Sequence, residues 1–250
     1  MPVVLKSPKE IEKMRRAGQI VREVLELVRG LVKPGATTLD LEKAAEARLK
    51  ELGVKAAFKG YHGFPCVLCT SVNSEVVHGI PSSKRVLKDG DIVSVDFGVV
   101  VDGYYGDAAI TVPVGEKIDA TTARLLEVTE RSLHAGIAAV KPGATLGDVG
   151  AAVQGVVEAE GFSVVRDFVG HGIGVHMHED PQVPNFGQAG RGMKLKTGMV
   201  IAIEPMVNAG KPDVQVLGDG WTAVAKDGSM SAHFEHTVAV TATGARILTE

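Results

Sequence analysis

The 250-residue sequence contains only two cysteines, and this scarcity excludes a small secreted fold held together by disulfide bonds. Its apolar runs are far shorter than the roughly 20 residues that a membrane-spanning helix needs, so we expect no membrane partner. A formal net charge of -3 argues against a nucleic-acid binder that relies on a basic face. The apolar stretch in the N-terminal segment MPVVLKSPKE is too short for a signal peptide, which predicts a cytoplasmic location.

An internal repeat organises the chain. The segment VKPGAT at 32–37 returns at 140–145, which is an offset of 108 residues (140 minus 32). The same offset aligns LKDGDIVSVD at 87–96 with LKTGMVIAIE at 195–204. Agreement in two separated blocks at one fixed offset indicates duplication. We therefore predict a single domain over 1–250 made of two homologous halves, about 1–115 and 116–250.

Each half has the same order of local signals. Ser7 and Glu10 form a capping box, with Pro8 at the first helical position. Caps of the T-x-x-D type follow at 37–40 and, in the second half, at 145–148, and these helices should end near Gly53 and Gly161. The pattern then changes to strands: VLCTSV, DIVSVDFGVVV, YYGDAAITV, MVIAIEPMV and HFEHTVAV. This order predicts an α+β fold with one pseudo-symmetric antiparallel sheet and helices over its outer face.

A tight hairpin brings two aspartates together. Asp102-Gly103 is a strong two-residue turn signal, and it pairs Val101 with Tyr104. In that register Gly98 lies opposite Asp107, so Asp96 lies diagonal to Asp107 on the same face. Diagonal β-carbons are about 7–8 Å apart or somewhat less, so the two carboxylates could hold one cation between them.

The repeat extends this pair to four acids. Asp96 corresponds to Glu204, and Asp107 corresponds to Glu235, each on an otherwise apolar strand. His171 stands where the first half has Gly63, and it would add one nitrogen ligand. Four carboxylates with one imidazole suit two divalent ions of the Mn, Fe(II), Co or Zn type. Two such ions can activate a water molecule, so the pattern predicts a hydrolytic dinuclear site.

The other histidines and the cysteines give weaker signals. His78 and His178 each precede a turn that contains proline, and spacing alone leaves open whether they bind substrate or are ordinary loop histidines. The remaining histidines show no comparable pattern and are expected to be at the surface or structural: His62, His134, His176, His233 and His236. Cys66 and Cys69 form an unpaired CxxC in an apolar run, which favours a structural role.

At these residues the sequence resembles the type I methionine aminopeptidases over essentially its whole length. The blocks that carry the resemblance are SPKEIEKMRRAG, FKGYHGFP, VVHGIP, LKDGDIVSVDFG, YGDAA, GHGIGVHMHEDP, MVIAIEPMV, DGWTA and SAHFEHT. The resemblance implies the pita-bread fold and the bacterial-type short form. It implies metal ligands at Asp96, Asp107, His171, Glu204 and Glu235, substrate-orienting histidines at His78 and His178, and a methionine pocket at Tyr61, Phe64, Cys69, Met177 and Trp221.

The same resemblance implies a reaction. A metal-activated water would attack the first peptide bond of peptides and nascent chains whose second residue is small. Glu204 would accept a proton, His178 would polarise the carbonyl oxygen, and His78 would contact the scissile amide nitrogen. We expect a monomer that associates transiently with the ribosome. Two alternatives stay open: a proline-specific peptidase of the same fold, and a metal-free binding module.

Overall fold

The predicted helix caps form in the computed structural model, which describes residues 3–250. The Ser7 hydroxyl accepts the backbone N–H of Glu10, and the Glu10 carboxylate accepts the backbone N–H of Ser7. The same reciprocal box starts the helices after Thr37 and Thr145. Gly53 and Gly161, both with positive φ, follow the ends of these two helices. The four α-helices in this range are α1 (Pro8–Arg29), α2 (Thr38–Leu52), α3 (Ala120–Ala139) and α4 (Leu146–Ala159).

The strands form one large antiparallel sheet and two small ones. The nine-stranded sheet has the order β1-β4-β5-β14-β9-β7-β8, with β15 beside β14 and β2 beside β4. Its strands are β1 (Lys55–Ala56), β2 (Leu68–Val72), β4 (Ile92–Val101), β5 (Tyr104–Pro113), β7 (Gly170–Gly172), β8 (Glu179–Val183), β9 (Val200–Ile203), β14 (Glu235–Thr241) and β15 (Gly244–Ile247). The small sheets contain β13 (Ser231–His233), β10 (Met206–Asn208) and β6 (Ser163–Val164), and β11 (Val214–Val216), β12 (Ala223–Ala225) and β3 (Glu75–Val77).

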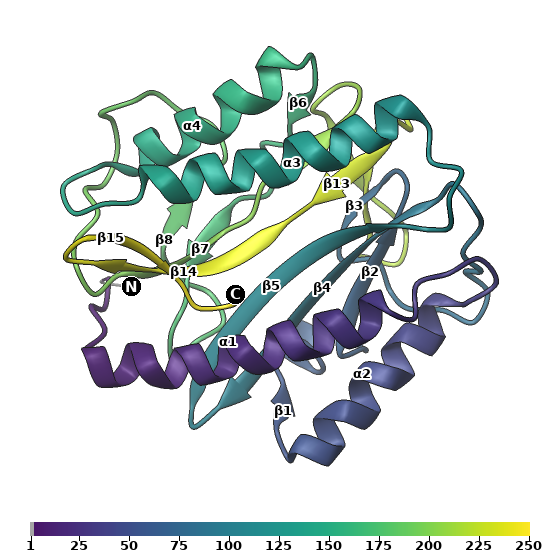
Figure 1. The fold of residues 1–250 in the computed structure, drawn as a ribbon, viewed down its shortest axis with the longest axis horizontal. Helices are drawn as coiled ribbons and strands as arrows, with labels where there is room; N and C mark the ends of the chain where they lie inside the picture. Colours follow the sequence, from purple (N-terminus) through teal and green to yellow (C-terminus); the bar gives the residue numbers. More distant parts are fainter. Residues whose placement is uncertain (1–2) are drawn as a thin grey trace.

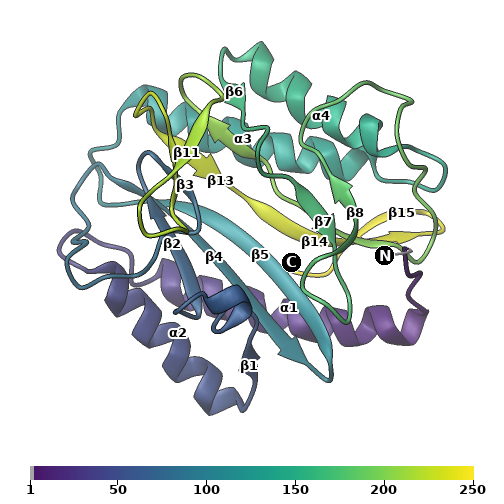
Figure 2. The ribbon, with the colours of Figure 1, turned by 180° about the vertical axis from the view of Figure 1, so that it is seen from behind.

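All four helices lie over one face of the curved sheet (Figure 1). Helices α1 and α2 cover the strands of the first half, while α3 and α4 cover those of the second. Figure 2 shows the opposite face, where β3, β11 and the loops around β7 and β8 lie. The predicted α+β class, with an antiparallel curved sheet and helices on its outer face, is confirmed.

The β4–β5 hairpin has the predicted register. Val101 pairs with Tyr104 and Gly98 pairs with Asp107. By contrast, two segments expected to be continuous strands are interrupted. MVIAIEPMV divides into β9 and β10 around Glu204-Pro205, and HFEHTVAV divides into β13 and β14 at Phe234. Pro205 has no amide hydrogen to donate, so the ladder breaks there.

The helices pack on the sheet through two main apolar clusters. Val21 and Leu41 pack with Val95 and Phe97 in one cluster, and α3 and α4 pack on the second-half strands in the other. Helix α1 approaches β5 so closely that a β-carbon on Gly106 would lie 2.8 Å from the Gly18 nitrogen. Glycine is therefore required at this contact, because any larger residue would separate the helix from the strand.

Equivalent contacts recur in the two halves. Thr37 bridges Val86, and Thr145 bridges Lys194, so both members of the pair shift by 108 residues (145 minus 37, 194 minus 86). The recurrence agrees with the duplication at 1–115 and 116–250, which stays a prediction.

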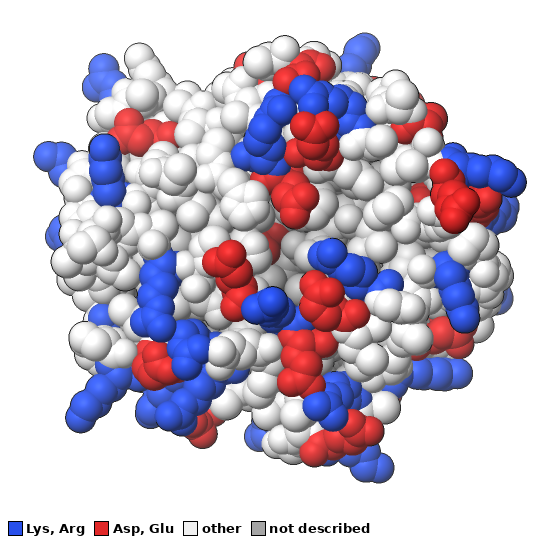
Figure 3. All heavy atoms as spheres, in the orientation of Figure 1, with Lys and Arg blue, Asp and Glu red and all other residues white. Residues whose placement is uncertain are grey.

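The outer face shows no large region of one charge among the described residues. Lys and Arg are interspersed with Asp and Glu over the helices (Figure 3). Within residues 3–250, none of the helices has the length and apolar character needed to cross a membrane.

Candidate metal centre and substrate pocket

Three neighbouring strands place the acidic residues in one row across the sheet. Asp96 of β4 pairs with Ala109 of β5, and Ala109 also pairs with Glu235 of β14. Directly opposed residues of an antiparallel sheet share a face, and so do residues two apart on one strand. Asp107, two residues before Ala109, therefore joins the same face. The short side chain of Ala109 leaves room between the carboxylates.

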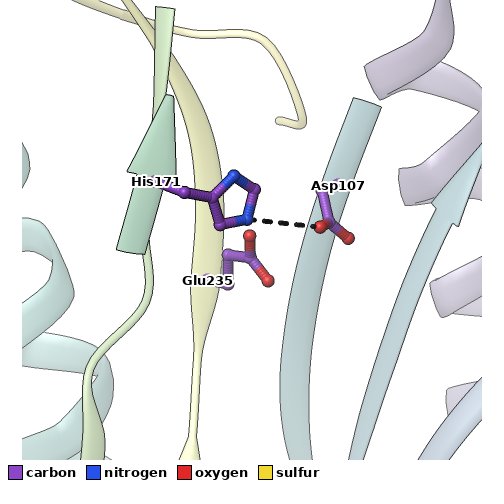
Figure 4. A group of neighbouring side chains, drawn as sticks. All are labelled: Asp107, His171 and Glu235. Carbon is purple, nitrogen blue, oxygen red and sulfur yellow. Dashed lines mark ion pairs between the residues drawn. The ribbon is translucent and has the colours of Figure 1, made fainter. Parts of the chain in front are cut away.

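The second half supplies the remaining members of the cluster. Ligand atoms of Asp107, His171 and Glu235 all lie within 4.8 Å of one another. Figure 4 shows these three side chains pointing toward one another from β5, β7 and β14. His171 Nε2 is 3.5 Å from Glu204 Oε1 and 3.9 Å from Asp107 Oδ2.

The backbone around His171 orients its ring. Nδ1 lies 2.9 Å from the Gly172 carbonyl oxygen, which leaves Nε2 facing the carboxylates. A β-carbon on Gly172 would lie 2.2 Å from the Asp180 carbonyl oxygen, so glycine lets β7 pack directly against β8. A hydrogen bond from Nδ1 to a carbonyl is the usual way in which a ligating imidazole is oriented.

Burial raises the pKa of all four acids. Removal from water raises the pKa of Asp96 to about 7. It raises the pKa values of Asp107, Glu204 and Glu235 well above the usual range, and the charge of neighbouring carboxylates adds to the effect. Without an opposing charge, these groups would therefore keep their protons to a higher pH than carboxyl groups in water do.

The donor set fits divalent cations. Asp96 Oδ1, Asp107 Oδ1 and Glu235 Oε1 are buried and have no hydrogen-bond partner among the described residues. Buried polar atoms without partners are rare, and cations bound between these carboxylates would satisfy them. Several carboxylate oxygens with one imidazole nitrogen match the donor preferences of Mn, Fe(II), Co and Zn.

Every predicted site residue lines one cavity of about 310 Å³. The five predicted metal ligands are at its base, and beside them lies an apolar cluster that contains Phe58, Phe64, Cys69 and Met177, with Tyr61 and Trp221 packed against it. The rings of Phe64 and Trp221 meet edge to face with centroids 5.1 Å apart. The cavity thus joins an anionic end to an apolar end.

The two loop histidines lie between these ends. The His178 ring centroid is 4.3 Å from that of His171, and its Nδ1 is 2.7 Å from the Tyr61 hydroxyl oxygen. His78 follows β3 with a φ of 62°, and its ring lies 6.5 Å from that of Trp221. Burial lowers the pKa of His78 to about 4 and lowers the pKa of His178 as well, which favours neutral imidazoles.

Two histidines that sequence reasoning set aside also lie here. His62 is exposed and lines the cavity mouth. His233 is 1% exposed, so it is not a surface residue, and its Nε2 is 3.8 Å from Glu204 Oε2. Its position two residues before Glu235 was the available signal, because residues i and i+2 of an extended chain point the same way.

Comparisons with known proteins agree with this geometry. The sequence profile of metallopeptidase family M24 matches residues 12–242. Methionine aminopeptidase 1 of Bacillus subtilis (strain 168) is 52% identical over 247 residues, which cover 99% of this chain and 99% of that protein. Methionine aminopeptidase A of Synechocystis sp. is also 52% identical, over 99% of this chain and 97% of that protein. The crystal structure of methionine aminopeptidase from Thermotoga maritima superposes with a TM-score of 0.97 at 52% identity, covering 99% of each chain.

Proposed function

The chain belongs to metallopeptidase family M24, and on that premise we propose that it is a metal-dependent aminopeptidase that removes N-terminal methionine when the second residue is small. The observation that carries the proposal is the cavity itself. An anionic end that fits metal ions lies beside an apolar cluster, and two imidazoles line the same cavity. The anionic end suits the substrate amine, the imidazoles suit the scissile bond, and the apolar part suits the first side chain.

We assign the metal-ligand role to Asp96, Asp107, His171, Glu204 and Glu235, and we propose that they hold two divalent ions. Two dications would neutralise four carboxylates, which accounts for otherwise unfavourable buried charge. When bound, such ions supply Lewis acidity and a water of lowered pKa at neutral pH. The free α-amino group of the substrate belongs at this end of the cavity, where the negative charge is concentrated.

We propose the remaining roles as the resemblance implies them, and the shared cavity of these residues supports the proposal. Glu204 lines the cavity with a side chain that is 14% exposed, and it is the proposed proton acceptor for the attacking water. His178 faces the carbonyl oxygen of the bond being cleaved and stabilises the negative charge that develops there. The Tyr61 hydroxyl fixes the orientation of His178. His78 contacts the scissile amide nitrogen from the opposite wall.

The apolar end takes the methionine side chain. Phe64, Cys69 and Met177 are buried and form its inner wall, while Tyr61 and Trp221 close its sides. A flexible, polarizable thioether makes favourable contacts with aromatic ring edges, which this pocket supplies.

Further features stay predictions from the sequence: duplication of two homologous halves, a monomeric state, transient association with the ribosome and a cytoplasmic location.

The function is tested with metal-depleted protein. The protein is reconstituted with Mn, Fe(II), Co or Zn in turn, the bound metal is counted per chain, and cleavage of Met-Ala-Ser is measured. Ala-Pro-Ser tests the proline-specific alternative, and acetylated Met-Ala-Ser tests the requirement for a free amine. We expect metal-dependent release of methionine from Met-Ala-Ser alone. Preferred cleavage before proline, or no cleavage and no metal binding under any condition, would contradict the proposal.

A further inference from the structure

We propose that His233 is a positioning residue that holds the Glu204 carboxylate by donating its Nε2–H to Oε2, so that Oε1 stays turned toward the metal-binding cluster. This inference rests on the proposed function, because it gives His233 a role only within a working metal centre. His233 lies outside the ligand set that the sequence predicted.

The first support is the environment of the His233 ring. The residue is 1% exposed, and neither Nδ1 nor Nε2 has a hydrogen-bond partner among residues 3–250. An imidazole carries at least one N–H whichever tautomer it adopts. A buried donor without a partner is unfavourable, so a contact with a nearby anion is expected. The nearest carboxylate oxygen is Oε2 of Glu204, at 3.8 Å.

The second support is that the backbone fixes the position of His233. Its N–H donates to Thr111 Oγ1 at 2.9 Å, and the Thr111 hydroxyl donates to the His233 carbonyl at 2.7 Å. His233 also pairs with Met206. These contacts fix the backbone that carries the ring, and the burial of His233 keeps the ring out of the solvent.

The register explains why His233 and Glu204 meet. His236 pairs with Ile203 before the strand interruption, and His233 pairs with Met206 after it. The paired residue numbers add up to 439 in both cases (236 plus 203, 233 plus 206), so the register is the same on both sides. The continued register sets Glu204 opposite Glu235, and His233 is the diagonal neighbour of Glu204. Diagonal neighbours on one face are within reach of long side chains.

The third support is the orientation of Glu204 itself. Its Oε1 is 3.5 Å from His171 Nε2, whereas its Oε2 is 3.8 Å from His233 Nε2. The carboxylate thus lies between one imidazole of the predicted ligand set and one outside it. A rotation of the carboxylate that shortens the 3.8 Å separation of Oε2 from His233 Nε2 would bring the two atoms within hydrogen-bond distance. With one oxygen held in this way, the other has a defined direction, which both a ligand and a proton acceptor require.

Three substitutions separate positioning from a structural role. His233→Gln keeps an N–H donor near the position of Nε2, His233→Asn keeps polarity but falls short of that position, and His233→Leu removes all donors at similar volume. His134→Leu, on an exposed position of α3, is the matched control. The measurements are kcat and KM for Met-Ala-Ser with Mn, Co(II) affinity, the Co(II) visible absorption spectrum and Tm of the metal-free protein.

We expect His233→Leu and His233→Asn to lower kcat about 10–100-fold with KM little changed, to weaken Co(II) binding and to alter the Co(II) spectrum. His233→Gln should restore each value to within about threefold of the unmodified protein. Because Gln and Asn are both polar, their comparison stays informative if the Leu variant does not fold.

Two results would overturn the inference. Unchanged kcat, Co(II) affinity and spectrum in the Asn variant, with only Tm lowered, would show a structural role. A loss of Co(II) in the Gln variant as large as that in Asp96→Asn, which removes a proposed ligand and is measured alongside, would make His233 a ligand instead. If the unmodified protein fails to cleave Met-Ala-Ser with every metal, the proposed function fails, and Co(II) affinity and spectrum still decide the role of His233.

Discussion

Asp96 and Glu235 lie on two different strands, and each of them is paired with Ala109 on the strand between. Adjacent strands are about 4.8 Å apart, so the backbones of these two residues lie about 10 Å apart across the sheet, and the residue directly between them has only a methyl side chain. The first half of the chain supplies Asp96 and the second supplies Glu235. Residues from both halves of the chain therefore line the space over the Ala109 side chain. We propose that the metal ions bind in this space.

Replacement of Asp96 by Asn should abolish most activity. The substitution keeps the shape of the side chain but removes one charge from a site proposed to hold two dications. Residues that merely contact metal ligands change affinity or activity by about 10–100-fold, so loss of a ligand should exceed about 100-fold in kcat/KM. Metal content per chain should fall in parallel. Asp102→Asn, at the exposed turn of the same hairpin, is the control and should behave like the unmodified protein.

Metal removal should make stability depend on pH. Burial raises the pKa of Asp96 from about 4 to about 7, so between these pH values the metal-free folded state binds a proton that the unfolded state does not. Stability therefore falls as pH rises through this window. Bound cations replace the protons, so the loaded protein should not show the fall.

Thermal unfolding at pH 5 and pH 8 measures this difference. The Tm of the metal-free protein should lie further below that of the loaded protein at pH 8 than at pH 5. Apparent metal affinity should rise with pH over the same range, because protons compete with metal ions for the carboxylates. A metal-free protein whose Tm relative to the loaded form is the same at both pH values would contradict the assignment.

Loss of either loop histidine should separate turnover from metal binding. His78→Ala and His178→Ala remove contacts that strengthen mainly as charge develops on the reacting amide, so kcat should fall about 10²–10³-fold for each. Bound metal per chain should stay the same. His134→Ala, on the outer helix α3, serves as the control. A variant that loses metal, yet turns over normally once reloaded, would show that the assigned role is wrong.

A buried carboxylate behind the pocket should matter for stability alone. Glu42 of α2 accepts the backbone N–H groups of Val67 at 2.7 Å and Leu68 at 2.9 Å, just before the strand that carries Cys69. Glu42→Ala leaves two buried donors unpaired, and each unpaired donor costs about 1–3 kcal/mol, so we expect a loss of about 2–6 kcal/mol. Glu46→Ala on the exposed side of the same helix should cost less than about 1 kcal/mol. Urea unfolding of both variants checks this, and equal losses would refute the role of Glu42.

Local patterns carried most of the information about the fold. The capping boxes at Ser7, Thr37 and Thr145 depend only on residues three apart, and the β4–β5 register follows from the two turn residues Asp102 and Gly103. The acidic row was accessible because it combines that register with the internal repeat. These predictions needed no knowledge of how distant segments meet.

Contacts between distant segments were harder to predict. Tyr61 meets His178 across 117 positions of sequence, and no local pattern joins them. The sequence pattern also did not predict that two strands break at Pro205 and Phe234, because the apolar residues on either side of each break continue the alternation typical of a strand. The register that makes Glu204 and His233 diagonal neighbours continues across the interruption. No local pattern joins residues 29 positions apart (233 minus 204), so His233 was set aside.

Selectivity for a small second residue is the sharpest test of the proposed substrate. The side chain of that residue must pass between the loops of His78 and His178, and both loops are held firmly. The Gly79 carbonyl accepts the Thr70 N–H at 2.8 Å, and a β-carbon on Gly79 would lie 2.2 Å from the Thr70 carbonyl oxygen, so the His78 loop packs directly on β2. On the other wall, the buried Lys6–Glu179 ion pair anchors the residue that follows His178.

Rigid walls make a large second side chain unfavourable, whereas the pocket for the first side chain discriminates weakly. One missing or altered methylene in an apolar pocket changes the transition-state free energy by only about 1–3 kcal/mol, so norleucine or leucine at the first position should be cleaved at reduced rates. A clash with two anchored loops cannot be relieved by small movements, so Met-Lys-Ser and Met-Phe-Ser should react far more slowly than Met-Ala-Ser, Met-Ser-Ser or Met-Gly-Ser. A peptide series varied only at the second residue, compared by kcat/KM, measures this. Comparable kcat/KM values for Met-Ala-Ser and Met-Lys-Ser would rule out the proposed selectivity. If anchoring of the His178 loop causes the selectivity, Lys6→Met, which removes the ion pair with Glu179, should reduce the difference between these two peptides.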